Sequence, residues 1–246
     1  PVEELISLFL ERKEAVGEIF KFFPRWVSRY EINGVSNSGE ADLLHDWGVT
    51  QLNSIFPVRD RTVIEMAPQE AAHTIMLHNF GAKRIVALEG RLENYIKCCV
   101  IKNIFGLHNC SFYLEDLRNV DLKKFGSFDV CLCSGILYHL SQPQELLAKI
   151  AGISPRILIN THYASDQFPK GCCEVSEVEL KGHRYRGKTH DEGDIRLPSA
   201  GLQRFSFWFF KDDLISLLED LGYSKIQVLM DWMPKAPGLT IYAETS

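Results

Sequence analysis

The sequence predicts an α/β fold in three layers, in which helices cover both faces of a mostly parallel seven-stranded sheet. From Thr62 onward, short β-branched runs alternate with stretches of helical periodicity. Two of the runs, at 127–133 and 155–160, are largely apolar, as strands buried on both faces are. The last two predicted strands are joined by a short connection rich in proline and glycine, so we expect them to pair antiparallel.

The predicted elements follow one another along the chain. An amphipathic helix over 3–23 ends before Pro24, and a loop of turn-forming residues leads to a short helix at 41–47. The remaining strands are expected at 62–65, 84–88, 110–114, 127–133, 155–160, 224–230 and 238–243. The remaining helices are expected at 69–80, 91–105, 142–152 and 211–222. We therefore expect a helical extension over 1–60 and one domain over 61–246, which carries an insertion at about 163–207.

Composition limits the class of protein. A chain of 246 residues with 46% hydrophobic content can bury one substantial core. No run of about 18 apolar residues suggests a membrane span, and the acidic start lacks the basic region of a secretory signal. Seven cysteines without Cys-x-x-Cys spacing indicate reduced thiols and a cytoplasmic protein. A net charge of −5 provides no general attraction to phosphate backbones, which argues against a nucleic-acid partner.

The stretch from Arg61 to Glu89 predicts a ligand site. It contains a strand that ends on Glu65, a helix, and a second strand that ends on Glu89. A right-handed βαβ crossover places the helix N-terminus and both acids at one edge of the sheet. Nucleotide-like ligands bind at this edge.

The order of elements resembles the class I S-adenosylmethionine-dependent methyltransferase fold, a Rossmann-like sandwich, over roughly residues 60–245. The segment Cys133–Leu140, with its Leu-Tyr-His-Leu phrase, is the most family-specific wording. The resemblance implies S-adenosylmethionine as cofactor and a methyl acceptor as substrate. It also places Glu65 at the end of the first strand, Glu89 on the ribose hydroxyls, Asp116 beside the adenine amino group, and Ser134 and Gly135 facing the methionine half.

The chemistry of these residues suits those roles. Glu89 follows Glu65 by 24 residues, a βαβ spacing, and its two carboxylate oxygens can accept from the two hydroxyls of a ribose. Asp116 can accept from an exocyclic amine, although a loop or cap role is a competing interpretation. Gly135 lets the backbone approach a ligand because it has no Cβ.

The first turn departs from the family pattern. Ala67, Ala71 and Ala72 stand where similar sequences carry glycines, and Ala67 remains a candidate for contact with the cofactor. An alanine at positive φ costs about 1–2 kcal/mol, whereas at negative φ its methyl group narrows the pocket. The substitutions therefore bear on cofactor affinity more than on the fold.

Methyl transfer requires alignment of the acceptor and, for a hydroxyl, removal of its proton. His139 follows the fourth strand and His162 follows the fifth, and both are candidate bases.

The insertion is the part expected to face the acceptor, because long connections of this kind are usually functional. We expect acceptor contacts from four side chains: Tyr138, Tyr163, Arg204 and Trp208. The histidines and acids of the insertion match no standard ligand spacing, so no metal site is predicted.

The sequence favours a methyltransferase that uses S-adenosylmethionine on an O or N atom of a small molecule. Two alternatives remain open. One is a methyltransferase that modifies tRNA, because the Leu-Tyr-His-Leu phrase and the late tryptophan also resemble enzymes of wobble-uridine modification. The other is a catalytically silent domain that acts as a binding or regulatory subunit, which the alanines of the first turn motivate. A nicotinamide-dependent dehydrogenase fits less well, because the glycine fingerprint is absent.

Overall fold

A computed structural model describes residues 13–169, 174–197, 199–232 and 236–246. The predicted helix over 3–23 appears as α2 (Lys13–Phe22), and its earlier part lies outside the described residues. Among the described residues, no helix combines the length and the apolar character needed to cross a membrane.

The central sheet has seven strands in the order β11-β12-β7-β6-β3-β4-β5, which confirms the predicted α/β class. Its five parallel strands are β3 (Thr62–Met66), β4 (Arg84–Glu89), β5 (Cys110–Leu114), β6 (Val130–Ser134) and β7 (Arg156–His162). The two last strands are β11 (Tyr223–Trp232) and β12 (Gly238–Thr245). Strand β12 pairs antiparallel with both β11 and β7, as the short connection predicted.

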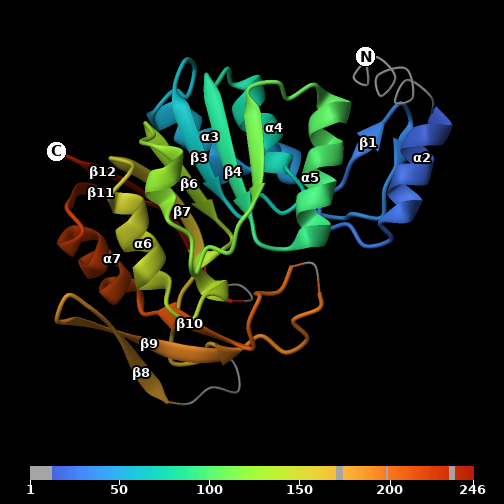
Figure 1. Cartoon of the computed structure of the whole chain (residues 1–246). Helices are drawn as coiled ribbons and strands as arrows, with labels where there is room; N and C mark the ends of the chain where they lie inside the picture. The colour runs from blue at the N-terminus through green and yellow to red at the C-terminus, as the bar shows by residue number, and fades with distance from the viewer. Residues whose placement is uncertain (1–12, 170–173, 198, 233–235) are drawn as a thin grey trace.

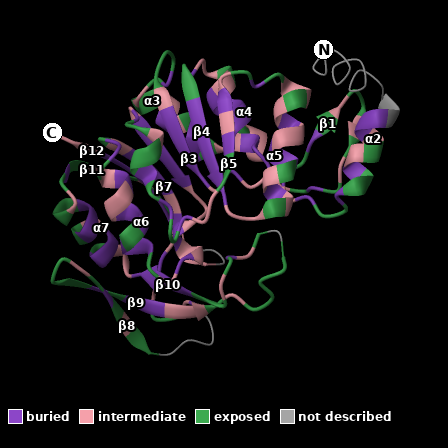
Figure 2. Ribbon diagram, viewed as in Figure 1, coloured by how far each residue is buried: buried purple, intermediate pink, exposed green. Residues whose placement is uncertain are grey.

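Helices cover both faces of the sheet (Figures 1 and 2). One face packs against α3 (Trp47–Ile55), α4 (Ala72–Asn79) and α5 (Leu92–Phe105). Helix α2 lies beyond α5 (Figure 1) and adds Val16 and Phe20 to the same core. The other face packs against α6 (Pro143–Ala151) and α7 (Lys211–Asp220). Alternate residues of one strand enter the two cores. In β3, Ile64 lies in the core with α6 and α7, and Val63 lies in the core with α4 and α5. This period of two explains why the strands carry apolar residues on both faces.

The insertion folds into a small antiparallel sheet that the sequence did not reveal. Its strands are β8 (Val175–Leu180), β9 (His183–Asp191) and β10 (Phe205–Phe209), in the order β10-β9-β8. It lies beyond one end of the central sheet (Figure 1). The side chains of Val178, Tyr185 and Phe207 belong to the same core as α6 and α7, so the insertion is packed onto the domain.

The structure differs from the sequence prediction before the first strand. The expected helix at 41–47 is a single 3₁₀ turn, Leu43–His45, and the α-helix follows it as α3. The Asp46 side chain accepts a hydrogen bond of 2.9 Å from the Val49 N–H and so caps that helix. A short hairpin, with two residues in each strand, pairs β1 (Glu31–Ile32) antiparallel with β2 (Val35–Ser36).

The segment before the sheet is tied to the domain by a buried ion pair. Glu70 and Lys97 are both fully buried, and Lys97 Nζ lies 3.0 Å from Glu70 Oε1. The Glu70 carboxylate also accepts from the backbone N–H groups of Val27 and Ser28, at 3.0 and 2.7 Å. Both charges are therefore paired inside the protein, and residues 27 and 28 are held against the turn that follows β3.

Candidate functional site

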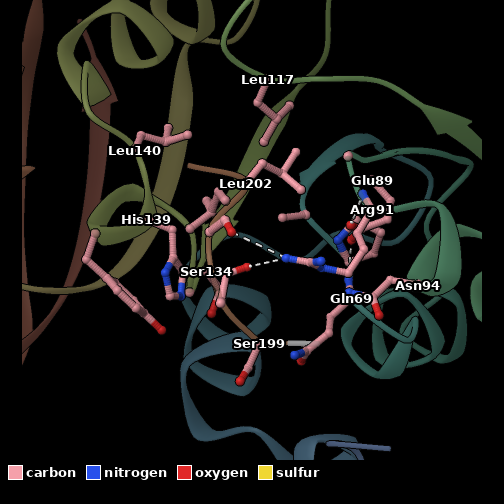
Figure 3. A pocket seen from close by; sticks show the side chains of 18 of the residues that line it. Gln69, Glu89, Arg91, Asn94, Leu117, Ser134, His139, Leu140, Ser199 and Leu202 are labelled. Carbon is pink, nitrogen blue, oxygen red and sulfur yellow. Dashed lines mark hydrogen bonds between the residues drawn. The ribbon is translucent and has the colours of Figure 1, made fainter. Parts of the chain in front are cut away.

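A cavity of about 330 Å³ lies at the carboxyl edge of the central sheet (Figure 3). Its walls come from the turn after β3, the ends of β4 and β6, the segment around Asp46, and residues 199–203 of the insertion. Figure 3 shows Glu89, Gln69 and Asn94 on one side and His139 and Ser134 on the other. Its volume lies in the range of small-molecule sites, about 300–1,000 Å³.

Glu89 is the carboxylate fixed most firmly in the cavity wall. It is 5% exposed, and its Oε2 and Oε1 accept from the backbone N–H groups of Gln69 at 3.0 Å and Arg91 at 2.8 Å. Burial raises the pKa of Glu89 to about 7, against the lowering effect of these hydrogen bonds. Each carboxylate oxygen has a second lone pair, so the group can still accept from a ligand diol.

The turn after β3 contains three residues other than glycine at positive φ. Ala67, Gln69 and Ala71 have φ values of 54°, 56° and 68°. The sequence comparison with the family pattern pointed to Ala67, Ala71 and Ala72, but Ala72 is the first residue of α4 and Gln69 takes the third left-handed position. This conformation also explains why α4 begins at residue 72 instead of 69. A Cβ in this region costs about 1–2 kcal/mol per residue.

Glu65 lies behind the turn and is absent from the residues that line the cavity. It is 1% exposed, and its Oε2 accepts a hydrogen bond from the Thr74 hydroxyl of α4. Burial raises the pKa of Glu65 to about 7.

Asp116 lines the cavity beside Leu117 and Arg118. The Arg118 guanidinium donates to both oxygens of Asp116 at 2.5–3.0 Å. This hydrogen bonding lowers the pKa of Asp116, so the group is an ionised acceptor at neutral pH.

The loop after β6 brings Ser134, Gly135, Tyr138 and His139 to the cavity. Gly135 has φ +74°, and a Cβ built there would meet only the Tyr138 hydroxyl, at 3.8 Å. This distance is an ordinary van der Waals contact, so the positive φ, and not a lack of space, explains the use of glycine.

His139 is held by a residue of the insertion. Its Nδ1 lies 2.7 Å from Oε2 of Glu192, whose side chain is 4% exposed. The same carboxylate oxygen accepts from the Gly201 N–H at 3.1 Å. The strand-end pattern that identified His139 gave no sign of Glu192, which is 53 residues further along the chain.

The other predicted residues are not among those that line the cavity. His162 stacks on Trp208, with ring centroids 5.2 Å apart, and the Trp208 Nε1–H donates to the Tyr138 carbonyl. Burial lowers the pKa of His162. Tyr163 donates to Asp231, and Arg204 forms an exposed ion pair with Asp191. His162 and Trp208 therefore support the Tyr138 loop from behind.

Residues 199–203 form a cover that the sequence did not predict. The Arg91 Nη2 donates to the carbonyl oxygens of Ile195, Ala200 and Gly201 at 3.0, 3.0 and 3.3 Å. Gly90 allows close contact, because a Cβ there would lie 2.7 Å from Leu202 Cδ1. The side chain of Arg91, two residues after Glu89, thus anchors the cover of the cavity.

Asp46 and His73 also line the cavity and were not singled out from the sequence. His73 Nε2 lies 3.8 Å from Asp46 Oδ2, and burial lowers the pKa of His73 although Asp46 opposes this shift. The sequence expectation placed a helix at 41–47, so Asp46 was not recognised as the N-cap of α3. In the described part of the chain, no three His, Cys, Asp or Glu side chains gather in a way that would hold a metal ion.

Comparison with known proteins shows which fold this is. No family model matches the chain. The curated relatives that it matches are tRNA U34 carboxymethyltransferases, for example those of Shewanella baltica (strain OS155 / ATCC BAA-1091) and Shewanella sp. (strain W3-18-1), each 24% identical over 140 residues. The match covers 56% of this chain and 41% of each relative, so the chain spans less than half of their length.

Solved structures match over nearly the whole chain. The N-terminal domain of EvdMO1, crystallised in the presence of S-adenosylhomocysteine and D-fucose, has a TM-score of 0.80 at 24% identity, covering 95% of this chain and 97% of that domain. The longer EvdMO1 structure has a TM-score of 0.71 at 23% identity, covering 96% of this chain and 48% of that one. Magnesium protoporphyrin IX methyltransferase from Synechocystis PCC 6803, with bound S-adenosylhomocysteine, has a TM-score of 0.56 at 13% identity and 80% coverage of both chains. The chain therefore has the class I methyltransferase fold, as predicted.

Proposed function

We propose that this protein is an S-adenosylmethionine-dependent methyltransferase that acts on an O or N atom of a small molecule. One observation carries the proposal. The buried carboxylate of Glu89 and the imidazole of His139 line the same cavity at the carboxyl edge of the sheet. In this fold, nucleotide-like ligands bind at that edge. The structural neighbours crystallised with S-adenosylhomocysteine or S-adenosylmethionine support the same assignment.

The donor set of the cavity fits this cofactor. Glu89 offers two fixed oxygens to the ribose hydroxyls, and Asp116 offers an ionised acceptor to the adenine amine. Leu117 and Leu202 supply apolar surface for the adenine ring. On the β6 side, Ser134 and Gly135 would hold the methionine half.

The chain itself must orient the acceptor and remove its proton. When bound, S-adenosylmethionine supplies a methyl group carried on a positively charged sulfur. Of the two predicted bases, His139 lines the cavity and His162 does not, so His139 is the proposed base. Burial raises the pKa of Tyr138 to about 12, so its phenol stays protonated and can donate to the acceptor.

A tRNA acceptor is the second candidate, and the similarity to tRNA U34 carboxymethyltransferases favours it. The net charge of −5 and the calculated pI of about 5.9 favour a small molecule, because tRNA binding draws most of its affinity from basic side chains. A catalytically silent regulatory domain is the third candidate. It is motivated by the first turn, where residues other than glycine occupy left-handed positions and bear on cofactor affinity. We also infer a cytoplasmic setting, since the described cysteines are free thiols.

Calorimetric titration with S-adenosylmethionine and S-adenosylhomocysteine tests the proposal. We expect binding in the micromolar range, weakened at least about tenfold in Glu89→Gln, because a hydrogen bond to a charged group contributes about 1.5–3 kcal/mol. Glu179→Gln, an exposed acid on β8, is the matched control and should bind as the wild type does. Absence of heat from either ligand with folded wild-type protein would refute cofactor binding.

The acceptor is then sought with labelled S-adenosylmethionine. A panel of hydroxylated and amino small molecules, beginning with D-fucose, is compared with total tRNA. Label on tRNA alone would establish the second candidate. Cofactor binding without transfer to any acceptor would favour the silent domain.

A further inference from the structure

We infer that Glu192 positions His139 as a base for a hydroxyl acceptor. This inference rests on the proposed function and deepens it by naming a positioning residue and the chemical class of the acceptor. Glu192 belongs to the insertion, directly after β9, whereas His139 belongs to the loop after β6. The pair therefore exists only when the insertion is packed on the domain.

The geometry assigns the two nitrogens of the imidazole. Nδ1 of His139 lies 2.7 Å from Oε2 of Glu192. An ionised carboxylate only accepts hydrogen bonds, so the Nδ1 atom carries the proton of the neutral ring. The Nε2 atom is then the basic nitrogen, and His139 is a wall residue of the cavity. A hydrogen bond on one imidazole nitrogen commonly selects the tautomer in this way.

Glu192 is held as a carboxylate. Burial alone would raise its pKa, but hydrogen bonds from His139 and from the Gly201 N–H keep the pKa below its ordinary value. Beside the imidazole, the other titratable groups are the phenol of Tyr138, with ring centroids 4.2 Å apart, and the imidazole of His162, while the imidazole of His190 packs on Trp208. Neither imidazole supplies a negative charge, and Tyr138 stays protonated.

The cover of the cavity keeps Glu192 in place. Gly201 donates to Glu192, and a Cβ at Gly201 would lie 2.8 Å from the His139 carbonyl oxygen. The Arg91 Nη2 also donates to the Gly201 carbonyl oxygen, at 3.3 Å. The acid, the imidazole and the cover therefore pack as one unit with little freedom to separate.

This arrangement suits a hydroxyl acceptor. A neutral amine has a free electron pair and needs no base before it attacks, whereas a hydroxyl becomes strongly nucleophilic only as its proton leaves. The hydroxyl proton moves to Nε2 of His139 while the oxygen electron pair forms the bond to the methyl carbon, and the electrons of the broken carbon–sulfur bond stay on sulfur. The negative charge of Glu192 stabilises the imidazolium that forms.

Nitrogen NMR of the ligand-free protein tests the positioning role without any acceptor. At a pH where the imidazole is neutral, we expect the His139 signals of the wild type to show the proton on Nδ1. Glu192→Ala should shift the tautomer toward Nε2–H, and Asp191→Ala, an exposed neighbour paired with Arg204, should not. An Nε2–H tautomer in the wild type, or an unchanged tautomer in Glu192→Ala, would overturn the inference.

Kinetics with Glu192→Gln separate charge from shape. Glutamine fills the same space and can still accept from Nδ1, so we expect kcat for O-methylation to fall about 10²–10⁴-fold while KM for the cofactor changes less than about threefold. The acid limb of the kcat–pH profile should also move. Methylation of an amino counterpart of the acceptor should fall less than tenfold. Equal losses on both acceptors, or an unchanged kcat, would refute the role.

The two levels of inference fail differently. If the wild type neither binds S-adenosylhomocysteine nor transfers a methyl group, the proposed function fails, whatever the tautomer of His139. If the wild type methylates a hydroxyl and Glu192→Gln is as fast, only the role of Glu192 fails.

Discussion

Replacing the left-handed residues of the first turn by glycine should stabilise the protein at some positions and not at others. Ala67 and Gln69 are partly buried, at φ 54° and 56°. Removing the Cβ relieves about 1–2 kcal/mol at each. The greater freedom of glycine in the unfolded chain returns about 0.4–1 kcal/mol. We therefore expect Ala67→Gly and Gln69→Gly each to raise the free energy of unfolding by about 0.5–1 kcal/mol.

Burial changes the expectation at the next two positions. Ala71 is also left-handed, at φ 68°, but it is 0% exposed, and loss of its buried methyl group costs about 0.8 kcal/mol. The effects nearly cancel, so Ala71→Gly should leave stability within about 0.5 kcal/mol of the wild type. Ala72 lies in α4 and is 2% exposed, so Ala72→Gly should cost about 1–2 kcal/mol.

Urea unfolding followed by circular dichroism measures all four variants. The contrast between adjacent alanines is the sharp part of the test, because Ala71 and Ala72 differ in backbone conformation and not in residue type. Equal destabilisation by Ala67→Gly and Ala72→Gly would refute the assignment of strain to positive φ. Calorimetry with S-adenosylhomocysteine on the same variants shows whether the methyl group of Ala67 also limits cofactor affinity.

Two further predictions concern buried charges. The raised pKa of Glu65, about 7 against an ordinary 4.5, means that the folded protein keeps a proton that the unfolded chain releases, so stability falls as pH rises through this window. Glu65→Gln should remove that loss, so the variant should be about 2–4 kcal/mol more stable than the wild type at pH 8 but not at pH 4. Urea unfolding at both pH values measures this difference, and an equal effect at both would contradict the prediction. Lys97→Met should lower the free energy of unfolding by about 3–5 kcal/mol, because it leaves Glu70 without its cation. The double variant with Glu70→Gln should lose less stability than the sum of the two single variants. Additivity in this double-mutant cycle would contradict the prediction.

The central sheet could be predicted because its signals are local. Apolar runs such as 155–160 are buried on both faces, and their alternation with helical stretches specifies parallel strands. The sheet of the insertion could not be predicted, because its strands β8 and β9 mix charged residues with few apolar ones and bury only a minority of their residues. Their pairing depends on packing against α6 and α7, which no short window contains.

The candidate site was predictable where it depends on strand ends. Glu89 and Ser134 are the last residues of β4 and β6, and His139 lies in the short turn after β6, so topology brings them to one edge. Glu192 and the cover at 199–203 reach the site through long-range packing, and nothing in their local spacing indicates it. Trp208, a predicted acceptor contact, does not line the cavity, and its Nε1–H donates to the Tyr138 carbonyl.

The attachment of residues 27 and 28 to Glu70 has a consequence for how such chains can be recombined. The backbone N–H groups of these residues and the ammonium of Lys97 together neutralise a carboxylate that is wholly inside the protein. A chimera that joins the segment before the sheet of one relative to the sheet of another must carry matching partners for that carboxylate. The unit of exchange is therefore the segment, the turn and α5 together, although they are separated along the chain.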